Sequence, residues 1–213
     1  MTAGTWCDAT NLVAVDLEGS GAQDGDDEAI LEIAAVRLIN GRPDVATAYS
    51  TLVNPGRRIG QRPWISPGLT DETLASAPPL DEIAPQVARR LTGAYLIGHN
   101  VRVDWRLLHR RCTSLSIAGL IDTYQLAKTW PATGKRTLTA LLNQHGLTSA
   151  VNDAVPMGRP HRALWDTIGA ALLLDSLVRR RWPDRQPSLT TLLPAARPPQ
   201  PALPASPPAT LFG

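Results

Sequence analysis

The sequence predicts an α/β domain with a mixed central sheet flanked by helices, and three observations support this fold class. Three strand-like apolar segments come first in the chain, at residues 11–17, 30–39 and 45–53. Short strands and helices then alternate along the chain. Apolar residues recur at helical spacing in the long segment 162–181. Early strands followed by this alternation are typical of a sheet with both antiparallel and parallel pairs.

Turn residues separate the first three expected strands. Segment 11–17 is rich in β-branched residues, and the Gly-Ser-Gly sequence at 19–21 ends it. An Asn-Gly pair at 40–41 turns the chain after the second strand, and Asn-Pro-Gly at 54–56 follows the third. Glycine, proline and asparagine favour the backbone angles of turns, so these positions predict an antiparallel meander.

Helices and short strands are expected over the rest of the domain. A helix at 80–91 contains Pro85, and because proline has no backbone N–H, helical geometry is expected to begin close to it. The other expected elements are a short helix at 71–75, a strand at 95–97, a helix at 103–112, a strand at 117–121, and helices at 123–130, 138–145 and 162–181.

The composition predicts one domain over residues 8–182 and a flexible proline-rich tail over residues 183–213. The tail holds nine of the nineteen prolines, and such a segment is not expected to form a packed core. With 43% hydrophobic residues, the 213-residue chain can bury a core without disulfides. Cys7 and Cys112 are too far apart in sequence to form a metal-ligand motif.

The chain shows no signature of secretion or membrane insertion. Its first residues lack a basic start followed by an apolar run, and no apolar stretch reaches the roughly 20 residues that span a bilayer. We therefore expect a reduced, cytoplasmic protein that does not enter the membrane.

Charge is distributed unevenly along the chain. Residues 1–83 carry thirteen acidic and five basic side chains, whereas residues 84–213 carry six acidic and sixteen basic ones. Basic side chains near a site attract polyanions, which favours nucleic acid as a partner. The alternative is that the arginines only solvate helix surfaces. The basic positions near the later motifs are Arg89, Arg90, Arg102, Arg106, Arg110, Arg111, Lys128, Lys135, Arg136, Arg159 and Arg162.

An acidic pair follows the first expected strand. Asp16 and Glu18 are two residues apart, so on a strand their carboxylates project from one face. Two neighbouring carboxylates repel each other unless a cation lies between them, and Mg²⁺ or Mn²⁺ prefers such oxygen ligands. The alternative interpretation is an acidic pair that only caps a turn.

Two further segments carry candidate site residues. Asp104 falls in the first turn of an expected helix. It is interpreted either as a metal ligand or as an acid that only favours the start of the helix. Asn100 is expected to hydrogen-bond a carboxylate that binds the metal. His161 and Asp166 are five residues apart, about 140° around a helix, so His161 must precede the helix. Asp166 lies on an apolar face and needs a partner, and a loop histidine is a suitable general base.

Taken together, the three segments resemble the DEDDh branch of the DnaQ-like 3′–5′ exonuclease superfamily. The resemblance extends from about residue 12 to residue 177 and includes the phrases at 54–56, 65–72 and 121–123. It implies a ribonuclease H-like exonuclease fold and a divalent-metal-dependent phosphodiester hydrolase. The implied products are 5′-mononucleotides released from a 3′ end.

The resemblance also implies a role for each matching position. Asp16, Glu18 and Asp166 would bind one ion, Asp16 and Asp104 would engage a second, and His161 would take the proton from the attacking water. This gives two Mg²⁺ or Mn²⁺ ions per site, which stabilise charge on the attacking and leaving oxygens.

A second group of positions is expected to contact the terminal nucleotide. Leu17 and the turn that includes Gly19 and Ser20 match positions that contact it, and Ile65 lies where an apolar side chain would pack near the last base. Many proofreading members have Thr-Thr-Gly after the glutamate. The glycine at position 19 removes one side-chain contact, so binding of the terminal nucleotide is expected to differ.

Alternative functions remain open at this point. The favoured substrate is DNA with single-stranded or frayed 3′ ends, and an RNA-trimming exoribonuclease of the same family is the alternative. A binding module with secondary catalysis is another, because residues 209–213 loosely resemble Leu-Phe-ending peptides that dock on the sliding clamp. The tail would then tether the domain to a clamp or polymerase. Against this, so short a match arises readily by chance.

Overall fold

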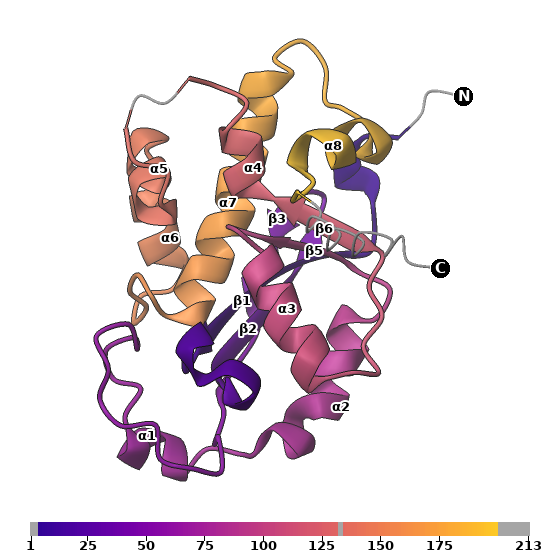
Figure 1. Ribbon diagram of the computed structural model, residues 1–213. Coiled ribbons are helices and arrows are strands. Elements are labelled where there is room, and N and C mark those ends of the chain that lie inside the picture. The colour runs from indigo at the N-terminus through magenta and orange to yellow at the C-terminus, as the bar shows by residue number, and fades with distance from the viewer. Residues whose placement is uncertain (1–3, 132–133, 200–213) are drawn as a thin grey trace, which may run out of the picture.

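A six-stranded mixed sheet forms the centre of the fold (Figure 1). The computed structural model describes residues 4–131 and 134–199. Along the sheet the strand order is β3-β2-β1-β5-β6, and β4 pairs with β2. The first strands pair antiparallel, whereas β1, β5 and β6 pair in parallel, as the sequence predicts. The strands are β1 (Leu12–Gly19), β2 (Ile30–Ile39), β3 (Arg42–Pro43), β4 (Tyr49–Leu52), β5 (Tyr95–Gly98) and β6 (Gly119–Asp122).

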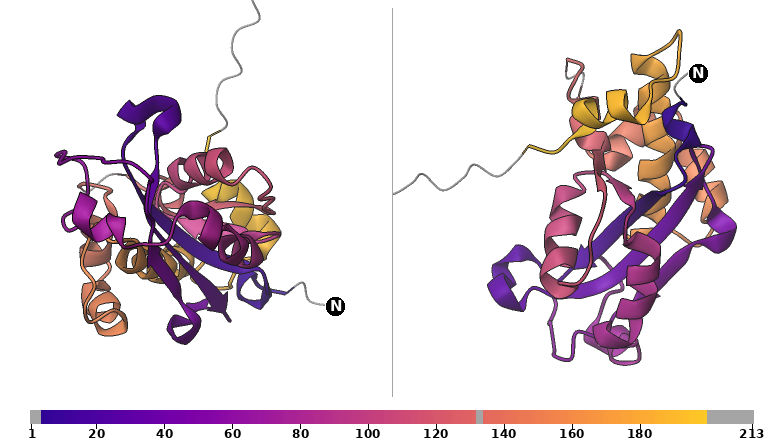
Figure 2. Two further views of the ribbon diagram at one scale, coloured as in Figure 1. Left: turned by 90° about the horizontal axis from the view of Figure 1, so that it is seen from below. Right: turned by 90° about the vertical axis from the view of Figure 1, so that its right-hand side faces the viewer.

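Helices cover both faces of the sheet (Figures 1 and 2). The α-helices of the described residues are α1 (Asp71–Ala75), α2 (Leu80–Leu91), α3 (Arg102–Arg111), α4 (Thr123–Ala127), α5 (Leu138–Gln144), α6 (Thr148–Ala154), α7 (Ala163–Arg181) and α8 (Leu189–Ala196). Short 3₁₀ helices lie at η1 (Trp6–Asp8), η2 (Ala22–Asp27) and η3 (Val45–Thr47). No helix in these described ranges is long and apolar enough to cross a membrane.

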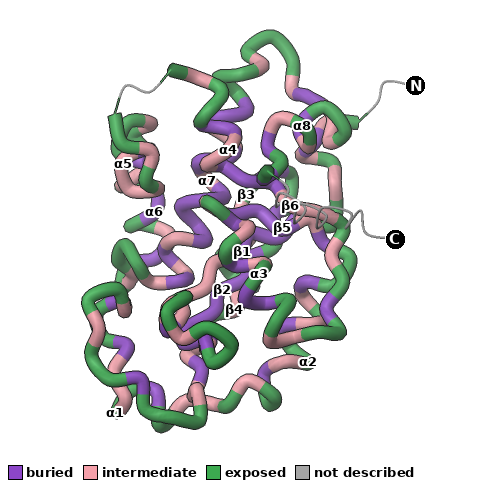
Figure 3. Tube along the Cα trace, viewed as in Figure 1, coloured by how far each residue is buried: buried purple, intermediate pink, exposed green. Residues whose placement is uncertain are grey.

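The alternation of β1 decides which face each of its side chains occupies. Leu12 and Ala14 pack into the core beside α7, whereas Val13 and Val15 pack into the core beside α2 and α3. Side chains two residues apart share a face, so Asp16 and Glu18 continue the row that faces α7. Burial is concentrated along β1, β2 and α7, and the loops at the carboxyl end of β1 are largely exposed (Figure 3).

Two predicted elements differ from the structure. The third strand is shorter than expected, because η3 precedes β4 and the extended pairing with β2 begins only at Tyr49. Helix α2 spans Leu80–Leu91, which is the predicted range, but it begins five residues before Pro85 and not close to it. The helix tolerates the missing N–H of this exposed proline because Ile83, Val87 and Leu91 bury its other face against the sheet.

The boundary predicted at residue 182 is also wrong. Residues 189–196 form α8, which the Ser188 side chain caps by accepting a hydrogen bond from the backbone N–H of Thr191. Leu192 and Ala196 are fully buried in the main core. The Trp6 indole N–H donates to the Gln186 side chain at 2.8 Å, which ties this segment to the N-terminal residues. Apolar burial thus outweighs the proline content here, while residues 200–213, including the proposed clamp-docking end, lie outside the described residues.

Candidate active site

Three of the predicted acids meet at the carboxyl end of β1. Asp16 and Glu18 project from this strand toward α7, and Asp166 projects from the first turn of α7. One carboxylate oxygen from each of these three residues lies within 4.8 Å of the other two. Residues separated by about 150 positions in the sequence therefore form a single group of oxygen donors.

Asp104 completes the acidic pocket from the first turn of α3. Its side chain is buried, and Oδ1 accepts a hydrogen bond from the backbone N–H of Leu17 at 3.0 Å. This bond places Asp104 between the two β1 acids along the strand. Its negative charge raises the pKa of Asp16, so the two carboxylates interact directly through space.

The four acids are held in an unfavourable environment for negative charge. Burial, followed by repulsion from neighbouring carboxylates, raises the pKa of Glu18 to about 7 and that of Asp16 well above its usual range. Burial also raises the pKa of Asp104 to about 8 and that of Asp166 to about 7. In the described part of the chain no lysine, arginine or histidine forms an ion pair with any of them.

This arrangement fits a divalent cation. Buried carboxylates that repel each other are stabilised by an ion between them, and a set made only of oxygen donors suits a hard cation. The group formed by Asp16, Glu18 and Asp166 is therefore a candidate divalent-metal site.

His161 lies on the loop immediately before α7, as its spacing to Asp166 predicts. Its side chain is exposed and its backbone has a positive φ of 64°. The backbone N–H donates to Oδ2 of Asp166 at 3.2 Å. The left-handed turn thus orients the Asp166 carboxylate while leaving the imidazole on the open side of the pocket.

Ser66 is a site residue that the sequence does not reveal. It is buried, and its hydroxyl donates to Oε2 of Glu18 at 2.5 Å. It follows Ile65, which is half-buried against Ile59 and Leu69. The phrase at 65–72 is the only signal in the sequence for this contact, because a serine in a loop carries no chemistry of its own.

The expected role of Ser20 in nucleotide binding is wrong for its side chain. Ser20 is fully buried; its hydroxyl donates to Oδ2 of Asp24 at 2.6 Å and accepts from the backbone N–H of Ala29 at 3.0 Å. Packing favours glycine at position 19, because a Cβ there would lie 3.2 Å from Leu107 Cδ2. A side chain at position 19 would therefore require this leucine methyl group to shift slightly. Leu17 remains partly exposed.

Asn100 does not make the expected hydrogen bond to a ligand carboxylate within the described ranges, and its predicted contact with the substrate stays a prediction. Its side chain is exposed and makes no hydrogen bond to an acid of the pocket among the described residues. Instead its backbone, at φ 65°, donates from N–H to Oδ1 of Asp122 at 2.9 Å. The neighbouring His99 is likewise structural, with Nδ1 2.9 Å from the Thr123 hydroxyl and Nε2 2.8 Å from the Arg136 carbonyl. These contacts fix the chain where it leaves β5 toward α3.

A buried ion pair anchors the loop that carries His161. Glu32 is the antiparallel partner of Glu18 in the sheet and is buried. Its carboxylate accepts from Arg162 Nε at 2.8 Å, from Arg162 Nη2 at 3.0 Å and from the backbone N–H of Ala163 at 3.3 Å. Arg159 donates to the Pro67 carbonyl at 2.6 Å and joins the same loop to the segment before α1.

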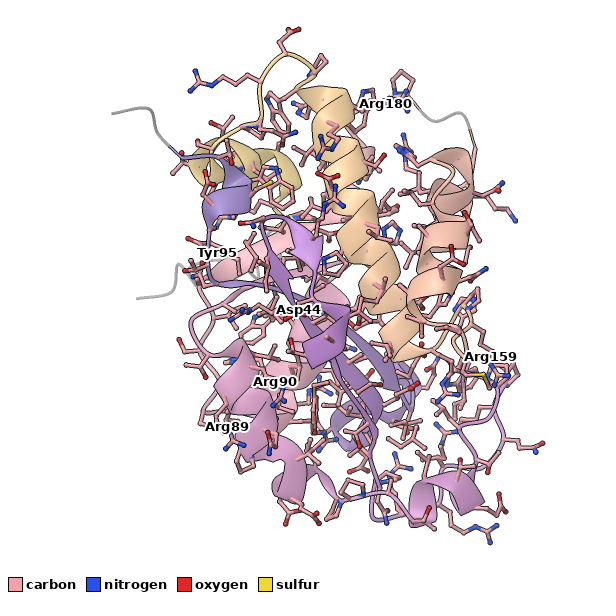
Figure 4. All side chains as sticks on the ribbon, turned by 180° about the vertical axis from the view of Figure 1, so that it is seen from behind. Asp44, Arg89, Arg90, Tyr95, Arg159 and Arg180 are labelled. Carbon is pink, nitrogen blue, oxygen red and sulfur yellow. The ribbon has the colours of Figure 1, made fainter. Side chains whose placement is uncertain are left out.

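Several arginines of the predicted basic group serve the fold. Arg106 binds both carboxylate oxygens of Glu28, at 3.0 and 2.8 Å, and Arg111 donates to the Glu28 carbonyl. Figure 4 shows Arg89 and Arg90 together on α2, far from Arg159 and from Arg180 on α7. Ion pairing with the fold therefore accounts for Arg106 and Arg111, and the basic positions near the later motifs lie on separate parts of the surface.

A mixed sheet with helices on both faces and acids at the end of its first strand is a ribonuclease H-like nuclease architecture. The family model RNase_T, described as Exonuclease, matches residues 13–174. The chain belongs to this exonuclease family, within the DEDDh group of DnaQ-like members.

Curated relatives come from bacterial replication proteins. A "DNA polymerase III subunit epsilon-like protein" of Rhodobacter capsulatus is 33% identical over 175 residues, which cover 79% of this chain and 24% of that protein. A "DNA polymerase III PolC-type" of Thermotoga petrophila is 31% identical over 161 residues, covering 73% of this chain and 11% of that protein. The chain therefore spans about a quarter or less of these relatives.

Solved structures share the fold. "Exonuclease X in complex with 5' overhanging duplex DNA" is 26% identical, with a TM-score of 0.59, and covers 87% of this chain and 99% of that chain. The nuclease domain of 3'hExo, described as a DEDDh family member bound to rAMP, has a TM-score of 0.57 at 15% identity, and covers 80% of this chain and 91% of that chain.

Proposed function

We propose that this chain is a 3′–5′ exonuclease that removes nucleoside 5′-monophosphates from nucleic-acid 3′ ends, with DNA as the favoured substrate. The observation that carries the proposal is the convergence of Asp16, Glu18, Asp104 and Asp166 beside the loop that holds His161. A phosphodiester resists hydrolysis because its negative charge repels a nucleophile. A pocket that gathers cations and places a base beside them addresses both difficulties.

The acids would hold two Mg²⁺ or Mn²⁺ ions, one between Asp16, Glu18 and Asp166 and one between Asp16 and Asp104. When bound, such ions supply charge stabilisation to the attacking and leaving oxygens. Ser66 holds the Glu18 carboxylate in its orientation, and the Leu17 N–H does the same for Asp104. The exposed imidazole of His161 would accept the proton from the attacking water.

The terminal nucleotide would lie across the end of β1. Leu17 and Gly19 are partly exposed beside the acids, and Ile65 lies next to Ser66 on the facing loop. These three residues are the proposed contacts for the terminal sugar and base. The preference for DNA is supported by the epsilon-like and PolC-type relatives and by the DNA complex of Exonuclease X.

One assay tests both the reaction and the substrate. Oligonucleotides of DNA and RNA, labelled at the 5′ end, are incubated with the protein and Mg²⁺, Mn²⁺ or EDTA. We expect a ladder that shortens from the 3′ end with either metal and stops with EDTA, and faster shortening of DNA than of RNA. Faster RNA shortening would establish the exoribonuclease alternative. An uncut label in every condition would refute the proposed function.

The contact with a sliding clamp or polymerase stays a prediction for residues 209–213. Removing residues 207–213 and measuring clamp binding in solution tests it. We expect weaker binding if the Leu-Phe pair is the anchor, and unchanged binding would end this part of the proposal.

A further inference from the structure

Large apolar side chains are exposed next to the site. The large hydrophobic residues that are exposed within the described ranges are Ile39, Val45, Trp64, Val103 and Met157. Three of these belong to site-bearing segments: Trp64 lies two residues before Ser66, Val103 adjoins Asp104, and Met157 precedes His161 by four residues. Trp64 is the aromatic one and is 49% exposed. A large aromatic side chain this exposed beside a site is a candidate ligand contact, and the contacts of its ring decide the matter.

The indole of Trp64 is held in a fixed position. Its Nε1–H donates to the Ser20 carbonyl at 3.1 Å, in the turn that follows the catalytic strand. The pyrrole edge of the ring lies against Gly21, where a Cβ would be 2.4 Å from Nε1. Gly21 has a φ of 105°, so this turn both requires glycine and makes room for the ring. A ring fixed before binding loses little freedom when a ligand stacks on it.

The guanidinium group of an arginine lies close to the Trp64 ring. The Arg62 guanidinium lies 5.9 Å from the Trp64 ring centroid. Arg62 is anchored by Asp24 and by the same Ser20 carbonyl, and its side chain remains 27% exposed. An aromatic face with an adjacent guanidinium is the combination that binds single-stranded nucleic acid, since the ring stacks on bases and the cation attracts phosphates.

Two contacts place Trp64 near the acids. The Ser66 hydroxyl, two residues further along the chain, lies 2.5 Å from Oε2 of Glu18, and the Trp64 indole donates to Ser20, two residues after Glu18. Two residues of chain span at most about 7 Å, and stacked nucleotides of one strand are spaced by about 3.4 Å. An unpaired strand with its last phosphodiester at the acids would therefore have a neighbouring base within reach of the indole.

We propose that Trp64, with Arg62 beside it, stacks on an unpaired base just before the terminal nucleotide. The inference rests on the proposed function and adds a residue that contacts the strand beyond the terminal nucleotide. A base inside a duplex is already stacked on both faces, whereas an unpaired base has a face free for the indole. The competing explanation is that Trp64 only covers the turn at residues 19–21.

Binding to matched oligonucleotides separates the two explanations. The catalytically silenced Asp16→Asn form is titrated against 5′-fluorescein single strands that are intact or carry abasic sites at the second and third positions from the 3′ end. We expect Trp64→Ala, in this background, to weaken binding of the intact strand by about five- to a hundredfold and to leave binding of the abasic strand nearly unchanged. Trp64→Phe should recover part of the loss, because it keeps an aromatic face.

Ile39→Ala is the matched control, since it shortens another exposed apolar side chain on a distant strand end. It should bind both strands like the parent. Equal weakening of both strands by Trp64→Ala, or no weakening of either, would overturn the stacking role and favour the structural one. Thermal melting of each variant reports folding.

The two proposals fail separately. If the wild-type protein shortens oligonucleotides but Trp64→Ala does not alter recognition of the intact strand, the stacking inference alone is refuted. If no oligonucleotide is shortened, the exonuclease proposal fails whatever the binding data show.

Discussion

Two sets of acids lie at the same end of the sheet, and they differ in their partners. Glu18 and Glu32 face each other as antiparallel partners on β1 and β2. Glu32 is neutralised by the bidentate Arg162, whereas Glu18 accepts a hydrogen bond from the Ser66 hydroxyl and forms no ion pair within residues 4–131 and 134–199. The same contrast separates Asp24 from Asp16: the Ser20 hydroxyl, Arg62 and Arg57 lower the pKa of Asp24, while burial and neighbouring acids raise that of Asp16.

This difference teaches how to identify a site among many carboxylates. The first 83 residues hold thirteen acids, so the presence of acidic residues alone does not identify the active site. Paired acids such as Glu28 and Glu32 stabilise the fold, because each is matched by arginine. The acids of the pocket have no arginine, lysine or histidine partner among the described residues, so a bound cation or bound protons must compensate their charge. The predictions below exploit that contrast.

The largest effect is expected from Asp16→Asn. The change removes a ligand shared between both proposed ions, so oligonucleotide shortening should fall by about a thousandfold or more, which corresponds to the several kcal/mol that metal ions contribute. Single-turnover rates with Mg²⁺ measure the effect. Asp26→Asn, an exposed acid on the adjacent η2, is the matched control and should retain the wild-type rate. Substantial activity in Asp16→Asn would contradict the assigned pocket.

His161→Ala should have the next largest effect on the rate of oligonucleotide shortening. Removing a general base lowers kcat by about a hundredfold, while KM changes little because the acids still hold the ions. His109→Ala, an exposed histidine near the end of α3, serves as the control. A loss confined to KM would show that His161 binds substrate and does not transfer the proton.

Glu32→Gln should mainly lower the free energy of unfolding and should affect the reaction rate less. It leaves Arg162 with a neutral partner, and this pair is partly buried, with side-chain exposures of 7% for Glu32 and 28% for Arg162. We expect a loss of about 2 kcal/mol, between the values for surface and buried pairs. Urea denaturation measures it, with the exposed Glu82→Gln as control. In contrast, Asp16→Asn should stabilise the metal-free protein at pH 8, because it removes one of the repelling carboxylates. Equal destabilisation by both substitutions would contradict the difference drawn between paired and unpaired acids.

The last expected effect needs no substitution and is a pH-dependent shift in melting temperature. Folding raises the pKa of Glu18 and Asp166 to about 7 and that of Asp104 to about 8. The folded state therefore binds these protons more tightly, and the metal-free protein should lose stability as pH rises from about 4 to 8. Mg²⁺ or Mn²⁺ should raise the melting temperature more at pH 8 than at pH 5, because protons compete with the ions. A metal effect independent of pH would argue against these ligands.

The sequence predicts the scaffold and the acids well because both follow local rules. Alternation on β1 fixes the shared face of Asp16 and Glu18, and the spacing of His161 to Asp166 requires a loop before the helix. The contacts of the Ser20 side chain and of the Asn100 backbone were not predicted, because they involve Asp24, Ala29 and the distant β6, which no local pattern encodes.

The sequence by itself determined the class of fold, the presence of both antiparallel and parallel strand pairs, and the residue types that gather at the end of β1. Only the tertiary structure decided which acids are neutralised, that Ser66 and Glu32 support the site, and that α8 belongs to the core. The physical reason is the distance along the sequence over which each interaction acts. Periodicity and turns act over a few residues, whereas hydrogen bonds, ion pairs and burial act between segments that meet only after the chain has folded.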